Sequence, residues 1–131
     1  RALFLIVFAL LPFIGGAQEV DFFPEVEASF PGGEMKLLEF VNANLNNPLR
    51  PEDDNCIVFV AFVVDINGEI SNMKVERGCS DSLNNEALRI VSLMPEFIPG
   101  STKGNPVATY YRLLVRFKAP SRKEWRKKSK N

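Results

Sequence analysis

The residues of this sequence that could do chemistry are few, and its two cysteines are the most informative of them. Cys56 and Cys79 stand equally far on either side of Asn67-Gly68, a dipeptide that favours a tight turn between paired strands. A two-residue turn there would place the cysteines opposite each other, at a Cα separation that a disulfide tolerates. A bulge or a three-residue turn would shift the register and remove that geometry. The alternatives are a disulfide, which an oxidising compartment preserves, and two free thiols at strand ends.

The other reactive groups argue against catalysis. The chain contains no histidine, so the usual general base and the commonest metal ligand are both absent from it. The acidic cluster Glu52-Asp53-Asp54 lacks the alternating ligands and the glycine of a calcium loop. Pro31-Gly32-Gly33 lacks the lysine of a phosphate-binding loop. We therefore predict no catalytic residue, no metal site, no cofactor and no small-molecule substrate, and expect a binding function instead.

Composition limits the partners and the size of the fold. With 131 residues, the chain has room for one small domain. Its 16 basic and 16 acidic residues balance, which predicts no binding of nucleic acid. Only residues 119–131 are strongly basic, with lysines and arginines around Trp125. We expect a disordered tail there, and the alternative is contact with anionic lipid or an acidic partner.

The N-terminal residues 1–17 have the pattern of a signal peptide. Residues 2–14 are almost unbroken apolar sequence, too short to span a bilayer, and Gly15-Gly16-Ala17 supplies the small residues of a cleavage site. We predict export to the periplasm with cleavage before Gln18, which the mass of the mature protein tests. The alternative is an uncleaved inner-membrane anchor, and because the sequence begins with Arg1, further sequence can precede it.

The remaining chain predicts helix, strand, strand, helix, strand. After a short extended leader, residues 18–29, apolar side chains recur at helical spacing over residues 34–45 and again from Asp81 or Ser82 to Met94. Residues 57–66, 69–78 and 109–117 are rich in β-branched and aromatic side chains or alternate with period two. The simplest layering is an α+β fold with two helices packed on one face of a three-stranded antiparallel sheet.

Several motifs of residues 30–118 together resemble one protein family. A helix is broken by Met94-Pro95-Glu96-Phe97-Ile98-Pro99-Gly100 and leads through Lys103-Gly104-Asn105-Pro106-Val107 into the last strand. Upstream come Phe30-Pro31-Gly32-Gly33, Phe62-Val63-Val64-Asp65 with Asn67-Gly68, Val75-Glu76-Arg77-Gly78 and Asn85-Glu86-Ala87-Leu88-Arg89. This combination resembles the C-terminal domain of TonB-type energy transducers.

The resemblance implies a binding site on the last strand. Such domains leave that strand at the open edge of the sheet, where an extended segment of a TonB-dependent outer-membrane transporter pairs with it by strand addition. The partner-binding residues implied here are Thr109, Tyr110, Tyr111, Arg112, Leu113, Leu114, Val115, Arg116 and Phe117, with Tyr110, Arg112, Leu114 and Arg116 facing outward. The charged side chains of this strand can also guard the edge against aggregation.

Two functions remain open after this resemblance. One is a domain that docks transporters and takes part in energised transport across the outer membrane. The other is a free envelope module, for docking another envelope protein or for forming a homodimer, without energy transfer. Residues 18–29 favour the second, because they span at most about 40 Å when extended, a short tether for an anchored domain.

Overall fold

The computed structural model describes residues 19–130. The predicted signal peptide, residues 1–17, and its cleavage site lie outside these residues. Among the helices of the described part, none has the length and apolar character needed to cross a membrane.

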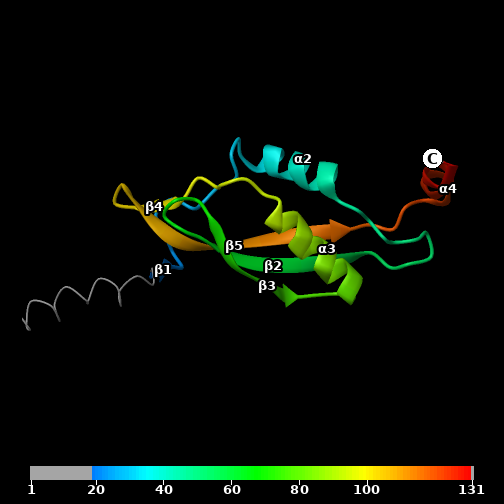
Figure 1. Cartoon of the computed structure of the whole chain (residues 1–131), viewed down its shortest axis with the longest axis horizontal. Helices are drawn as coiled ribbons and strands as arrows, with labels where there is room; N and C mark the ends of the chain where they lie inside the picture. Colours follow the sequence, from blue (N-terminus) through cyan, green and yellow to red (C-terminus); the bar gives the residue numbers. More distant parts are fainter. Residues whose placement is uncertain (1–18, 131) are drawn as a thin grey trace, which may run out of the picture.

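A curled sheet of five strands carries the fold (Figure 1). Its centre is antiparallel, with β2 (Cys56–Val64) lying between β3 (Ile70–Arg77) and β5 (Asn105–Phe117). Two short strands pair with β5: β1 (Val20–Asp21) in parallel and β4 (Gly100–Thr102) in antiparallel orientation. The α+β class and the antiparallel centre are confirmed, but three strands were too few. β1 and β4 were missed because two or three residues cannot show a period, and β1 lies in the segment predicted to be an extended leader.

Both long helices pack on the same face of the sheet, as predicted. α2 (Glu34–Asn44) lies beside β5, and α3 (Asp81–Ser92) lies beside β3 and β2 (Figure 1). Alternate side chains of the central strands point to this face and form the core with the helices. The core includes Val58, Val60, Phe62, Val64, Leu113, Val115 and Phe117 from the strands, Leu37 from α2, and Leu83, Ala87, Ile90 and Val91 from α3.

The β2–β3 turn differs from the two-residue turn that Asn67-Gly68 suggested. The Asp65 N–H donates to the Glu69 carbonyl at 2.9 Å, so three residues form the turn. Gly68 has φ 87°, and a Cβ there would collide with the Phe97 backbone. Only glycine meets both requirements without strain. The structure therefore has the three-residue alternative that the sequence left open.

Bulges in β3 correct the register that this turn shifts. The pairing of β2 with β3 changes between Ala61 and Val63, and again between Phe59 and Val60, with the extra residue on β3 each time. Val60 consequently faces Val75, as the two-residue turn would have placed them. A two-residue turn would also pair Phe62 with Met73, and that pairing is absent.

The two cysteines come together beyond the end of this hairpin. Cys56 and Cys79 form a disulfide in the structure, with their Cα atoms 6.5 Å apart. The shifts from turn and bulges largely cancel, and for this reason the cysteines meet although the turn is not the one assumed.

The helices depart from the predicted pattern at two points. In α2, Leu37 is buried but Leu38 stays 55% exposed, so only part of the apolar stripe packs on the sheet. In α3, the N-cap is Ser80, whose Oγ accepts from the Leu83 N–H at 3.3 Å, and not Asp81 or Ser82.

The basic tail forms a helix, whereas we predicted that it would be disordered. α4 (Arg122–Lys130) is capped by Ser121, whose hydroxyl accepts from the Glu124 N–H and donates to the Glu124 carboxylate. This Ser-x-x-Glu arrangement resembles a capping box and satisfies backbone donors at the helix start. Lysines in the last turn complement the helix dipole. The sequence contains this Ser-x-x-Glu capping motif, but the prediction of disorder rested on the high charge of the tail.

Candidate functional site

One side of β5 is paired along its length, and the hydrogen bonds of the turn decide which residues face that side. Asp65 donates to β3, and β2 is regular, so the even-numbered residues of β2 direct their backbone groups towards β5. The register pairs Val64 with Thr109 and Val60 with Leu113. The odd-numbered residues of β5 therefore bond to β2. The backbone groups of the even-numbered residues face away from the sheet.

The outer side of β5 is covered at both ends. At one end, β1 pairs with Ala108 and Thr109. At the other end, the Lys118 carbonyl accepts from the Asn47 side chain at 2.7 Å. Between them, on this outer side, no strand of the described chain pairs with residues 111–116. We call the outer side of residues 110–116 the open edge; it is about 20 Å long.

The predicted site residues divide accordingly. Arg112, Leu114 and Arg116 present N–H and C=O groups at the open edge. Tyr110 presents its C=O there, because the parallel pairing of β1 directs the Asp21 carbonyl towards the Tyr110 N–H. Thr109 does not, because its backbone groups face β2, and its side chain is fully buried. The other odd-numbered members face β2 and contribute side chains to the helix side of the sheet: Tyr111, Leu113, Val115 and Phe117.

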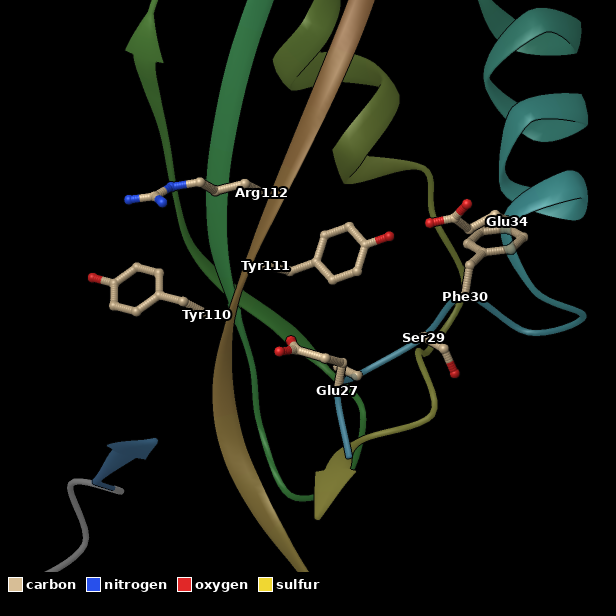
Figure 2. A pocket seen from close by; sticks show the side chains of 8 residues that line it. Glu27, Ser29, Phe30, Glu34, Tyr110, Tyr111 and Arg112 are labelled. Carbon is tan, nitrogen blue, oxygen red and sulfur yellow. The ribbon is translucent and has the colours of Figure 1, made fainter. Parts of the chain in front are cut away.

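A groove follows the open edge on the helix side of the sheet. Towards the start of the edge, a cavity of about 440 Å³ lies between the strand and the segment that enters α2 (Figure 2). Further along, a second cavity of about 210 Å³ lies between the strand and α2. Glu34 lines both cavities, so they adjoin, and we call them together the edge groove. Its walls are Glu27, Ala28, Ser29, Phe30, Glu34, Leu37, Leu38, Val41 and Asn42.

Tyr111 forms the floor of the first cavity. Its ring stacks on Phe62 at 5.3 Å and meets Phe97 edge-on at 5.1 Å, which fixes its position. Figure 2 shows the ring directed from β5 towards Phe30 and Glu34. Burial raises the pKa of the Tyr111 hydroxyl, and the carboxylates of Glu34 and Glu27 raise it further. The first cavity is therefore acidic on one side and aromatic at its base.

The opposite face of the sheet beside the open edge is charged and exposed. The Arg112 Nε lies 2.8 Å from the Glu76 Oε1, in an ion pair that crosses from β5 to β3 past the buried Ala61. Tyr110 stacks on Phe22 at 4.9 Å. Arg116 is exposed, and Leu114 is 42% exposed. These side chains flank the edge without covering its backbone groups.

The sequence did not identify the groove walls. Glu27 lies in the segment predicted as a leader and carries no recognisable signal. Glu34 and Leu38 are spaced four apart, so they share a helix face, and this was the one available hint. Within residues 19–130, no three metal-ligating side chains gather into a site.

A comparison with known families decides the identity of the fold. The model of the family described as Gram-negative bacterial TonB protein C-terminal matches residues 50–119. The chain belongs to this TonB C-terminal family. Comparison with curated proteins and with solved structures found no match.

The matched TonB region includes the open edge but not its walls. It runs from before β2 to just after β5, whereas Glu27, Glu34 and the rest of α2 precede it. TonB C-terminal domains are periplasmic, non-catalytic modules that couple transport and interact with TonB-dependent outer-membrane transporters. Membership of the family implies a TonB-like role in energy transduction.

Proposed function

We propose that the open edge receives an extended segment of a TonB-dependent outer-membrane transporter, and that the protein thereby takes part in energised transport across the outer membrane. The observation that carries this proposal is the row of unpaired backbone groups at Arg112, Leu114 and Arg116. An incoming strand forms main-chain hydrogen bonds with such a row, and these bonds supply affinity without requiring particular side chains.

Two further features support the proposal. The ladder from β2 to β5 runs without a register shift, so the outward groups are evenly arranged for a partner strand. The edge groove beside them leaves room for the side chains of that strand. The same edge can pair with β5 of a second copy, and the oligomeric state of the protein without peptide tests that alternative.

Proline at Leu114 is the sharpest test. It removes one outward donor and places its ring where the partner strand must lie, while the hydrogen bonds to β2 remain. We expect capture of peptides from transporter plugs to fall about tenfold or more, given about 1 kcal/mol for the hydrogen bond plus the steric clash. The measurement is the dissociation constant from fluorescence anisotropy with labelled plug peptides.

Two matched variants control this experiment. Leu114→Ala keeps the donor and removes only the side chain, so capture should change little. Val75→Pro removes an outward donor from the other edge of the sheet, on β3, and should leave capture unchanged. Full capture by a natively folded Leu114→Pro protein would show that strand addition at the open edge is wrong.

A further inference from the structure

Two carboxylates in the edge groove have no basic partner. Glu27 and Glu34 both line the first cavity, with Glu34 near the hydroxyl end of the Tyr111 ring and Glu27 beside the ring (Figure 2). Neither forms an ion pair with any residue of the described chain. Lys36 of α2 pairs with Glu39, and Arg112 of β5 pairs with Glu76 on the opposite face of the sheet.

The second cavity is apolar where the first is acidic. Leu37, Leu38 and Val41 of α2 line it together with Leu113 of β5. Leu38 is half exposed although it belongs to the apolar stripe of α2, so an apolar surface of the helix faces the groove. An aliphatic side chain placed here would remove this surface from water.

The spacing of the two cavities matches the period of a strand. Tyr111 lies at the first cavity and Leu113 at the second, two residues apart on β5. In a paired strand, the residues opposite Tyr111 and Leu113 are also two apart, and their side chains point to the same helix side of the sheet. One bound segment can therefore fill both cavities with alternate side chains.

We propose that the edge groove selects extended peptides that carry a basic side chain two residues away from an aliphatic one. The basic group lies by the Glu27 and Glu34 carboxylates, and the aliphatic group packs against Leu37, Leu38 and Leu113. This specificity rests on the proposed function, because it requires that a strand adds to the open edge. It holds for either direction of the bound chain, since the spacing of two is the same both ways.

The Glu27 and Glu34 carboxylates select the peptide in two ways, by attracting a basic side chain and by repelling an acidic one. A lysine in the cavity gains two opposite charges in a partly enclosed site, where they are screened less than at a free surface. A glutamate at the same position meets like charges, which disfavour it. We expect the lysine peptide to bind about tenfold more tightly than its glutamate counterpart, since close charge pairs at interfaces contribute about 1 kcal/mol or more.

The test uses three capped nonapeptides and the full chain. The first is Thr-Val-Thr-Lys-Thr-Leu-Thr-Val-Thr, and the others replace its lysine with glutamate or norleucine. Dissociation constants are measured for the native protein, for Glu27→Gln with Glu34→Gln, and for Glu27→Gln alone, which leaves α2 untouched. The control is Glu52→Gln with Asp54→Asn, which removes the same charge from the loop before β2.

The expected result is a preference for lysine over glutamate that falls severalfold in the double groove variant, partly in Glu27→Gln, and stays intact in the control. Affinity for the norleucine peptide should change little. Equal binding of the lysine and glutamate peptides, or a preference that survives the double groove variant, overturns the specificity while loss of capture by Leu114→Pro still supports strand addition. If Leu114→Pro captures every peptide as well as the native protein does, the proposed function fails and this specificity fails with it.

Discussion

The sheet has two long edges, β5 and β3, and they differ in regularity more than in surroundings. Each edge has a helix beside it and a cavity between strand and helix, of about 210 Å³ between β5 and α2 and about 370 Å³ between β3 and the end of α3. The outward groups of β5 from Tyr110 to Arg116 follow an unbroken register. β3 is interrupted twice, and Asn72 takes a left-handed φ of 52° in the first irregular stretch.

This difference explains why the two edges should accept a partner unequally. A bulge breaks the alternation of donors and acceptors, so a straight strand cannot pair along β3 for more than a few residues. Lys74, Glu76 and Arg77 add charge to the same edge. The sheet therefore shields β3 and leaves β5 receptive, which gives a docking strand one place to bind.

The largest expected effect on stability separates the side of β5 that bonds to β2 from the side that forms the open edge. Leu113 bonds to β2 at Val60, so proline there removes a ladder bond and should lower the free energy of unfolding by about 3 kcal/mol or more. Leu114→Pro should cost much less, because its N–H has no partner in the sheet. Urea denaturation of both variants measures the difference, and equal losses would contradict the assignment of the open edge.

The disulfide should stabilise the β3 side without affecting the β5 edge. It joins residues 23 apart in sequence, and closing a loop of that size contributes about 3 kcal/mol. Replacing Cys56 and Cys79 by serine should lower the unfolding free energy by about that amount while peptide capture stays unchanged. Counting thiols in denatured, unreduced protein from an oxidising compartment checks the bond, and two free thiols would exclude it.

The bulge at Asn72 should show in the cost of a β-branched side chain. Because its φ is positive, Asn72→Val should destabilise the protein by about 1–2 kcal/mol, whereas Asn72→Gly should be nearly neutral. Thermal unfolding of the pair measures this. A valine variant as stable as the glycine variant would mean that β3 is regular and that its edge is as receptive as that of β5.

The smallest expected effect on stability concerns α2, the helix that forms one wall of the edge groove beside β5. Glu86 accepts from Arg89 and from the Asn46 N–H, and Arg89 donates to the Asn44 carbonyl, so the pair holds the end of α2. The hydrogen bond from Arg89 lowers the pKa of Glu86 from its usual 4.5, against an opposing effect of burial. Its contribution to stability is therefore present above pH 4.5 and is lost as the pH falls through the lowered pKa of the folded state.

Glu86→Gln should accordingly cost about 1 kcal/mol at neutral pH. The difference from the native protein should shrink at acidic pH, where the native carboxyl becomes protonated as well. Urea denaturation across this range is the measurement. A difference that does not change with pH would indicate that the charge of Glu86 does not hold α2 in place.

Sequence alone determined the main elements, the sidedness of the sheet and the family. In the last strand, Leu113, Val115 and Phe117 alternate with Arg112, Leu114 and Arg116, and this period fixes which face meets the helices. Residues 57–64 are apolar throughout, which predicts a central strand covered on both faces. The motifs around Met94-Pro95 and Asn67-Gly68 were sufficient to suggest the TonB C-terminal family, because turns and helix ends depend on local backbone preferences.

Only the tertiary structure decided where the edge is open and what lies beside it. Tyr110 has the same parity as Arg112, but its N–H is covered by β1, which comes from a segment nearly ninety residues earlier. The exposure of Leu38 and the presence of Glu27 and Glu34 in one cavity likewise depend on how α2 and its leading segment pack against β5. Periodicity assigns a residue to a face of the sheet, but hydrogen bonding and packing between distant segments determine whether an edge remains free to bind.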